Sequence, residues 1–178
     1  MGSKKRLDVL LVERGLAESR SQAQALVLAG RVKGHSKAGE QVEESAELEV
    51  AAGARFVSRG GEKLAAVLDR FDVAVTGRRA LDAGASTGGF TDCLLQAGAA
   101  HVVAVDVGRG QLAWSLRTDP RVTVLERTNV RYLVPDDIGG AAELCTADLS
   151  FISLTVCAPA LARCVTADAD LVLLVKPQ

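Results

Sequence analysis

The sequence predicts an α/β protein in which a parallel sheet is covered by helices and is preceded by a small α+β module. From residue 79 onward, short apolar strand-like segments alternate with helix-like segments, which is typical of parallel sheets covered on both faces. Before residue 53, two short helical patterns are followed by short strand-like pieces. With 48% hydrophobic and 24% charged residues, the 178-residue chain has an ordinary globular composition. Its net charge of −1 excludes a uniformly polybasic protein.

The amino-terminal module begins with two helices. Leu7, Leu10 and Leu11 recur at helical spacing, and Gly15 suits the left-handed position that ends a helix. Ser19 is a favourable N-cap residue for a second helix, which should end near residue 30. The apolar face of this second helix is expected to be Ala23, Leu26 and Val27. Strand-like pieces at 31–33 and 47–50 then predict a small sheet.

Basic charge is concentrated at this end of the chain. Residues 1–37 hold eight basic and three acidic residues, a net charge of +5, whereas residues 38–62 carry −4 and residues 63–178 carry −2. A local basic region favours binding to a polyanion even when the whole chain is nearly neutral. The alternative is a solvated, charged helix pair, because runs of charge are weak evidence for a ligand.

The segment from Arg6 to Val50 resembles the RNA-binding module named after ribosomal small-subunit protein S-four. The resemblance is carried by the letters RLD at 6–8, GLA at 15–17, SR at 19–20 and GRV at 30–32. It implies contacts of basic side chains with RNA phosphates and structured RNA, a chemistry that suits the charge excess. The implied RNA-binding residues are Lys4, Arg6, Arg20, Arg31 and Lys33. The family's usual Val-Asn-Gly turn is replaced here by residues 33–37.

A second domain is expected after a linker at 53–58, so that the domains span 1–52 and 59–178. Its first helix begins near Glu62, with an apolar face formed by Leu64, Val67, Leu68 and Phe71. The strands that follow are expected at 79–81, 101–105, 122–125, 144–147 and 171–175. Helices are expected near 89–96, 111–116 and 154–163. Ligands of such sheets bind beyond the carboxyl ends of the strands.

A glycine-rich turn, Asp82–Phe90, follows the first of these strands and predicts a cofactor site. The turn allows close approach of a ligand to the backbone. Asp106 ends the next strand, where its carboxylate can accept hydrogen bonds from ribose hydroxyls. In a G-x-G-x-x-G dinucleotide loop the middle glycine would replace Ser86, and the carboxylate of Asp82 would repel a diphosphate. S-adenosylmethionine is cationic at its reactive end, so we expect it in preference to NAD. The remaining alternative is a turn without a ligand.

Three charged side chains, Lys63, Asp148 and Lys176, are candidate catalytic residues. Asp148 and Lys176 follow the fourth and fifth strands, on the side of the sheet where ligands bind. Individually each has another explanation. Lys63 could be an exposed lysine at the start of a helix, Asp148 could cap the next helix, and Lys176 could be a solvated lysine at the chain end.

The motifs SRGGEKL, LDAGASTGGFTD, VDVGRGQLAWSLR, ERTNVR, ADLSFISL and VKPQ resemble those of the TlyA family of ribosomal RNA 2′-O-methyltransferases. The catalytic half of that family is related to FtsJ-type enzymes, with a Rossmann-like class I methyltransferase sheet. The likeness covers nearly the whole chain. It implies S-adenosylmethionine-dependent methylation of cytidine 2′-hydroxyls in the RNA of ribosomal subunits. Members are often labelled hemolysins, a name that no membrane-spanning stretch in this sequence supports.

The resemblance also implies roles for individual residues. Lys63, Asp148 and Lys176 match three members of the family's Lys-Asp-Lys-Glu tetrad, and Lys176 would deprotonate or orient the ribose hydroxyl. The implied cofactor-binding residues are Asp82, Gly84, Ala85, Ser86, Gly88, Gly89, Asp106, Asn129 and Val130. Among them, the turn would hold the methionine end, Asp106 the ribose, and Asn129 with Val130 the adenine.

The family's glutamate and its last strands would follow residue 178, so the sheet is expected to be incomplete at its carboxyl end. This leaves two alternatives, a fragment or a shortened homologue that binds ribosomal RNA without catalysis. A nicotinamide-dependent oxidoreductase is a further alternative. No secretory leader is recognisable, so we expect a cytoplasmic protein that does not bind membranes. The four cysteines lack metal-ligand spacing and are expected to be buried thiols, with no metal bound. The oligomeric state is not predicted.

Overall fold

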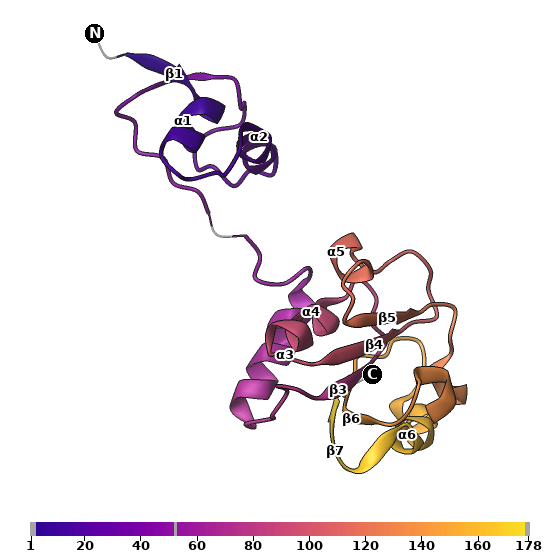
Figure 1. The fold of residues 1–178 in the computed structure, drawn as a ribbon. Helices are drawn as coiled ribbons and strands as arrows, with labels where there is room; N and C mark the ends of the chain where they lie inside the picture. Colours follow the sequence, from indigo (N-terminus) through magenta and orange to yellow (C-terminus); the bar gives the residue numbers. More distant parts are fainter. Residues whose placement is uncertain (1–2, 52, 177–178) are drawn as a thin grey trace. The chain divides into compact units, whose positions relative to one another are not determined.

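The computed structural model describes residues 3–51 and 53–176, and it divides into two compact units, Met1–Ala54 and Arg55–Gln178. Figure 1 shows the course of the chain through both units. The expected domain boundary at residue 52 and the last two residues of the VKPQ motif lie outside the described residues.

In the first unit, two short helices pack on each other over a small apolar core. Helix α1 spans Leu7–Glu13 and helix α2 spans Arg20–Leu28. Gly15 follows α1 with φ of +70°, and Ser19 Oγ accepts a hydrogen bond of 3.2 Å from the backbone N–H of Gln22. Both predicted helix boundaries are therefore confirmed. The core is formed by Leu7, Leu10, Leu11, Ala17, Ala23, Val27, Val32 and Val42.

The small sheet of this unit differs from the prediction. Strand β1 (Lys4–Arg6) pairs antiparallel with β2 (Gln41–Glu43), whereas the predicted strands at 31–33 and 47–50 make only an isolated bridge between Val32 and Val50. The predicted pairing of 31–33 with 47–50 is therefore confirmed only as this bridge. Strand β1 was not predicted, because Lys-Lys-Arg lacks the alternation of apolar and polar residues that marks a half-buried strand.

The second unit is built on a five-stranded, all-parallel sheet in the order β5-β4-β3-β6-β7. The strands are β3 (Arg79–Ala83), β4 (His101–Val105), β5 (Val122–Leu125), β6 (Ala142–Ala147) and β7 (Val165–Leu173). The helices are α3 (Arg59–Arg70), α4 (Gly89–Gln96), α5 (Trp114–Arg117) and α6 (Leu154–Arg163), with 3₁₀ turns η1 (Val130–Tyr132) and η2 (Pro135–Ile138). The predicted parallel α/β architecture is confirmed. Strand β7 begins six residues earlier than expected.

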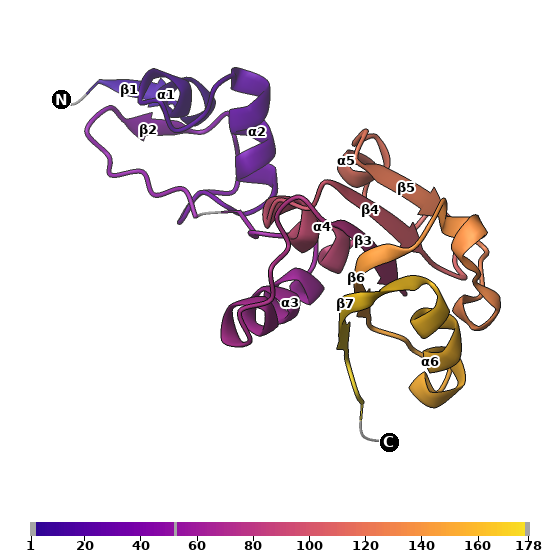
Figure 2. The ribbon, with the colours of Figure 1, turned by 60° about the horizontal axis from the view of Figure 1, so that its bottom comes forward.

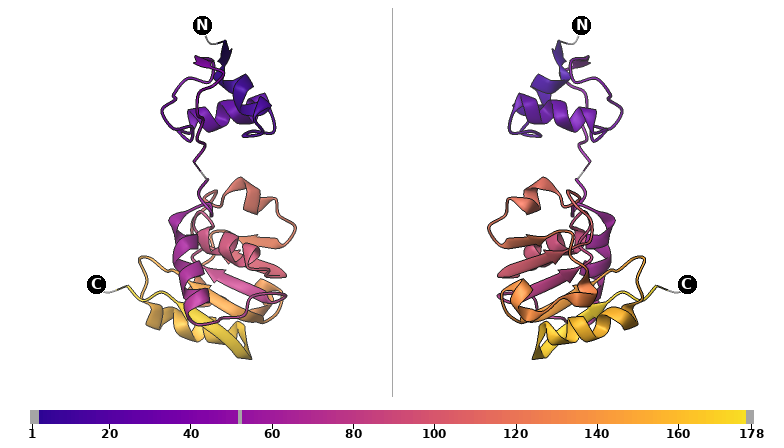
Figure 3. Two further views of the ribbon diagram at one scale, coloured as in Figure 1. Left: turned by 90° about the vertical axis from the view of Figure 1, so that its left-hand side faces the viewer. Right: turned by 90° about the vertical axis from the view of Figure 1, so that its right-hand side faces the viewer.

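Alternate strand residues point to two separate cores, one on each face of the sheet. Ala80 and Val102 face α3, α4 and α5, whereas their neighbours Leu81 and Val103 face α6, η1 and η2. Figure 2 shows α3 and α4 on one side of the sheet and α6 on the other, and Figure 3 shows the same layers from two further directions. Burial on both faces explains why the central strand β4, His-Val-Val-Ala-Val, is almost continuously apolar, whereas the edge strand β7 contains two aspartates and is partly exposed.

The second unit begins before the predicted end of the linker. The Phe56 side chain is only 3% exposed and packs in the core beside α3 and α4, and the N–H of Val57 donates to Asp92 Oδ2 at 2.8 Å. By contrast, Phe71, which was expected on the apolar face of α3, is 72% exposed, because α3 ends at Arg70 and the chain turns there.

Glycines allow α3 and α4 to approach each other closely. A Cβ atom on Gly61 would overlap the ring of Phe56, and a Cβ on Gly89 would overlap Ser58 Oγ. This contact places the start of α3, which carries Lys63, beside the turn that follows β3.

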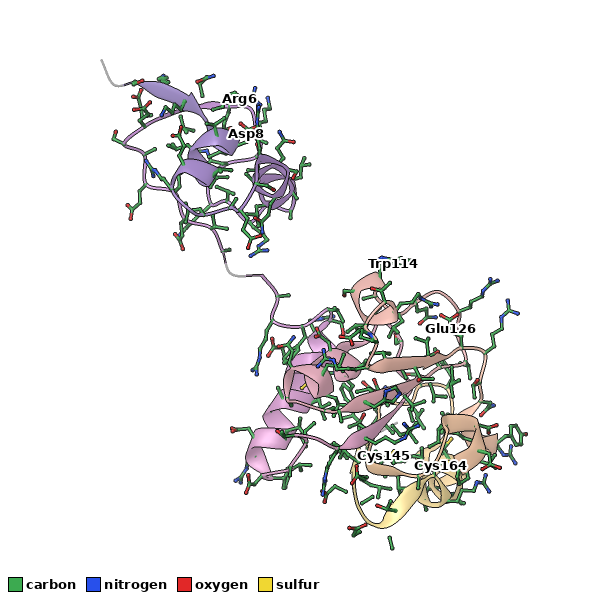
Figure 4. All side chains as sticks on the ribbon, in the orientation of Figure 1. Arg6, Asp8, Trp114, Glu126, Cys145 and Cys164 are labelled. Atoms are coloured by element: carbon green, nitrogen blue, oxygen red, sulfur yellow. The ribbon has the colours of Figure 1, made fainter. Side chains whose placement is uncertain are left out.

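All four cysteines lie in the second unit as buried free thiols, which confirms the prediction. Burial raises the pKa of Cys93 to about 11 and that of Cys145 to about 12. Figure 4 labels two of them, Cys145 in β6 and Cys164 directly after α6. Within residues 3–51 and 53–176, no helix combines the length and apolar content that crossing a membrane requires.

We predict that Gly61→Ala destabilises the second unit, because overpacking typically costs about 1 to 3 kcal/mol. Gly60→Ala is the matched control, since its new Cβ would meet only ordinary contacts, the nearest at 3.4 Å, and alanine favours a helix. Labelling of the four buried thiols during urea unfolding reports on this unit alone. Equal midpoints for the two variants would show that the packing of Phe56 against Gly61 is not limited by space.

Candidate active site

Two clefts meet at the carboxyl ends of the strands. The first, of about 510 Å³, is lined by Ser58, Arg59, Gly60, Lys63, Gly84, Ala85, Ser86, Thr87, Gly89, Phe90, Asp148, Ser150 and Lys176. The second, of about 360 Å³, is lined by Gly84, Ser86, Asp106, Val107, Gly108, Gln111, Asn129, Val130 and residues 148–152. Four residues line both clefts, so the two form one continuous site around the turn after β3.

The glycine-rich turn forms the floor between the clefts. At Gly84, φ is +86° and a Cβ would lie only 2.8 Å from the carbonyl oxygen of Asp148, so no other residue fits without displacing that backbone. Ser86 also has positive φ, at +50°, and its N–H donates to Asp106 Oδ2 at 2.8 Å. A bound molecule can therefore approach the turn backbone directly.

Asp106 holds the far side of this turn. One carboxylate oxygen accepts the N–H of Ser86, and the other accepts the N–H of Gly108 at 2.7 Å. Each carboxylate oxygen has a further lone pair, so Asp106 can still accept hydrogen bonds from the hydroxyl groups of a ligand in the second cleft. Asn129 and Val130 also line that cleft, and Asn129 Oδ1 caps η1 by accepting a hydrogen bond of 3.0 Å from the N–H of Arg131.

The three predicted catalytic side chains converge on the first cleft from three different elements. Lys63 comes from α3, Asp148 from the loop after β6, and Lys176 from the segment after β7. Lys176 Nζ lies 2.5 Å from Asp148 Oδ1 and donates to Ser150 Oγ at 3.0 Å and to the carbonyl oxygen of Leu149 at 3.2 Å. This ammonium group is held in place by three oxygen atoms at the edge of an open cleft.

Two predicted cofactor residues do not line either cleft. Asp82 is fully buried, and its carboxylate accepts hydrogen bonds from Thr91 Oγ1 at 2.7 Å and Thr146 Oγ1 at 3.3 Å. Burial raises the pKa of Asp82 to about 6, against the opposing effect of the two threonine hydroxyls. Gly88 instead makes room for α5, because a Cβ there would overlap the side chain of Leu116. Neither residue lines a cleft, and their expected contact with the cofactor stays a prediction.

The predicted RNA-binding residues all make contacts within the first unit. Lys4 pairs with Glu43 at 3.6 Å, and Lys33 pairs with Glu49 at 3.0 Å. Arg31 donates to the carbonyl oxygen of Ala51 through Nε and Nη2. Arg6 and Arg20 both bind the carboxylate of Asp8.

Sequence reasoning missed one wall of the first cleft. Ser58, Arg59 and Gly60 line it beside Phe90, and Ser150 receives a hydrogen bond from Lys176. The motif SRGGEKL was a signal for this wall, but only the packing of α3 against α4 shows that its first residues face the cleft. In the described part of the chain, no cluster of three His, Cys, Asp or Glu side chains could hold a metal ion.

Comparison with known families identifies both units. Residues 56–178 match the FtsJ-like methyltransferase family, and residues 5–33 match the S4 domain. The first match extends over more than half of the chain and includes both clefts.

Individual relatives agree with the family matches. The chain is 56% identical to the 16S/23S rRNA (cytidine-2′-O)-methyltransferase TlyA of Mycobacterium tuberculosis over all of this chain and 69% of that protein. It is 40% identical to Hemolysin A of Brachyspira hyodysenteriae over 97% of this chain and 74% of that protein. A Streptococcus thermophilus protein described as a hemolysin is 44% identical, with a TM-score of 0.69 over 99% of this chain and 67% of that structure.

A more distant structure shows the fold alone. The S-adenosylmethionine-bound amino pentose methyltransferase CalS10 of Micromonospora echinaspora is 21% identical, with a TM-score of 0.52 over 65% of this chain and 50% of that structure.

We predict that Asp82 makes the stability of the second unit depend on pH. The pKa of Asp82 is about 6 in the folded state and about 4 when unfolded, so the folded state binds more protons between these values and stability falls as pH rises from 4 to 6. The expected loss is about 3 kcal/mol. The amide side chain of Asp82→Asn does not titrate, so this variant does not lose stability by deprotonation at this position. Its free energy of unfolding relative to that of the parent chain should therefore rise from pH 4 to pH 6.

Urea unfolding followed by circular dichroism from pH 4 to pH 8 measures this difference. Other titrating groups are common to both proteins and cancel in the comparison. A constant difference between the two proteins across the range would contradict the role of burial at Asp82.

Proposed function

Since the chain belongs to the TlyA family of ribosomal RNA (cytidine-2′-O)-methyltransferases, with an FtsJ-like catalytic unit, we propose that its two clefts carry out this methylation through the residues described above. The enzyme is S-adenosylmethionine-dependent, as FtsJ-like methyltransferases are. The observation that carries the proposal is the convergence of Lys63, Asp148 and Lys176 on the cleft beside the glycine-rich turn.

The second cleft fits the adenosine part of the cofactor. It is lined by the apolar Val130, the amide side chain of Asn129 and the Asp106 carboxylate, which suits adenine and ribose hydroxyls. The space left by Gly84 accommodates the methionine part close to the backbone. Ala85 and Gly89 line the first cleft on this side. When bound, S-adenosylmethionine supplies an electrophilic methyl group.

The first cleft fits the ribose that is methylated. Lys176 lies at its edge with its charge directed by Asp148 and Ser150, and it orients or deprotonates the 2′-hydroxyl. The two roles differ in their pH dependence. A lysine that acts as a base must be in the neutral amine form, whereas a lysine that only donates a hydrogen bond acts as the ammonium. Lys63 lines the same cleft and adds a second positive charge near the developing alkoxide.

The first unit supplies RNA affinity. We assign it as the S4-like RNA-binding domain and the second unit as the methyltransferase domain, with ribosomal RNA as the shared substrate. Lys4, Arg6, Arg20, Arg31 and Lys33 are the proposed phosphate-binding residues. Because the proposed substrate is the RNA of ribosomal subunits, we place the protein in the cytoplasm. No finding favours the alternative of a non-catalytic RNA-binding protein.

We predict that Lys176→Ala lowers the rate of methyl transfer to ribosomal RNA by at least roughly 100-fold, the usual contribution of a positioned proton-transfer group. The affinity for S-adenosylmethionine should change by less than about twofold, because Lys176 does not line the second cleft. Transfer of labelled methyl groups and calorimetric titration measure the two quantities.

Arg70→Ala is the control for this experiment. Arg70 carries the same charge and ends helix α3 outside both clefts, so its removal should leave both quantities unchanged. Turnover that persists in Lys176→Ala would remove Lys176 from the reaction.

A further inference from the structure

One buried carboxylate in the first unit joins two arginine side chains that are otherwise exposed. Asp8 is completely buried, in the first turn of α1. Its Oδ1 accepts Arg6 Nε at 3.1 Å, and its Oδ2 accepts Arg6 Nη2 at 2.9 Å, Arg20 Nε at 3.0 Å and Gln24 Nε2 at 2.9 Å. Figure 4 shows the labelled side chains of Arg6 and Asp8 at this position.

The arrangement fixes both guanidinium groups without hiding them. The Arg6 side chain remains 43% exposed and that of Arg20 remains 55% exposed, although both bind the same carboxylate. Arg6 uses only one edge of its planar group on Asp8, and Arg20 uses only its Nε, so each keeps further N–H donors for another partner. The absence of a side chain at Gly39 leaves room for the Arg6 group, since a Cβ there would lie 3.1 Å from Nη2.

The two arginines are close enough to act together. Arg6 Nη2 and Arg20 Nε both donate to a single oxygen atom, so the two guanidinium groups lie side by side. Planar guanidinium groups in a fixed orientation are well suited to bidentate recognition of phosphate oxygens. Hydrogen bonds from Arg6 hold the pKa of Asp8 well below its usual range, which favours the charged carboxylate that binds both arginines.

We propose that Asp8 is a positioning residue for RNA binding, which holds Arg6 and Arg20 as a preorganised pair for a backbone phosphate. This inference rests on the proposed binding of ribosomal RNA by the first unit. It has an unusual consequence for charge. Removing an acidic residue ordinarily strengthens binding to a polyanion, whereas removing this one frees the two arginines to adopt other conformations and weakens binding.

The test compares Asp8→Asn with Glu49→Gln in the full chain. Glu49 is the control because it is also an acidic residue paired with a basic one, Lys33, but it is exposed and holds no arginine. The affinity for an in vitro transcribed ribosomal RNA fragment is measured at several salt concentrations. Binding of S-adenosylmethionine by the second unit and the circular dichroism spectrum check that the chain is folded.

We expect Asp8→Asn to weaken RNA binding roughly 10-fold, as for loss of a charge-assisted bidentate contact, and Glu49→Gln to leave it equal or slightly stronger. A triple variant, Asp8→Asn with Arg6→Lys and Arg20→Lys, should bind within about twofold of the Arg6→Lys and Arg20→Lys double variant. Such non-additivity shows that Asp8 acts through the two arginines. A general loss of structure would not produce it.

Asp8→Asn that binds RNA as tightly as the parent chain, or more tightly, overturns the inference. If Asp8→Asn fails to fold, Arg20→Lys decides, because it keeps the charge and the Asp8–Arg6 contacts but loses the fixed planar group. Unchanged affinity in Arg20→Lys then overturns the inference, and a loss of roughly 5-fold or more supports it. A parent chain that does not bind ribosomal RNA would instead overturn the proposed RNA-binding function itself.

Discussion

The second unit depends on the buried carboxylate of Asp82, which joins three elements of the catalytic fold. Asp82 lies in β3, and the two hydroxyls that it binds come from Thr91 in α4 and Thr146 in β6. These bonds connect the central strand to its neighbour in the sheet and to the helix that follows the glycine-rich turn. Parallel pairing of β3 with β4 and β6 then brings the ends of all three strands to one edge of the sheet. Asp106 and Asp148 reach the site because they follow these paired strands.

Three further carboxylates in this protein hold other groups in place. Asp106 holds the backbone of Ser86 and Gly108, Asp148 holds Lys176, and Asp8 holds two arginines. In each case an acidic group fixes the direction of donors that a mobile chain would leave unordered. Preorganised donors need no rearrangement when a substrate binds, which is a general source of catalytic and binding efficiency.

The sequence alone could predict the parallel sheet and the edge of the sheet at which the two clefts lie, because both leave local patterns. Continuous apolar runs mark strands buried on both faces, and the turn at 82–90 and the charged residues after the strands mark the edge where ligands bind. What it could not predict depends on contacts between distant segments. The pairing of Lys4–Arg6 with residues 41–43 has no apolar alternation, and the burial of Phe56 follows from the space above Gly61. The role of Asp82 depends on two threonines from other elements, so its place in the motif suggested a ligand contact instead.

The most direct test of the account is the identity of the nucleoside that receives the methyl group. Bacterial ribosomal subunits are incubated with the full chain and methyl-labelled S-adenosylmethionine, and the RNA is digested to nucleosides for mass spectrometry. We expect label in 2′-O-methylcytidine, because the cleft that holds Lys63, Asp148 and Lys176 is assigned to a ribose hydroxyl. Label on a base, or subunits that bind the chain without gaining label, would contradict it.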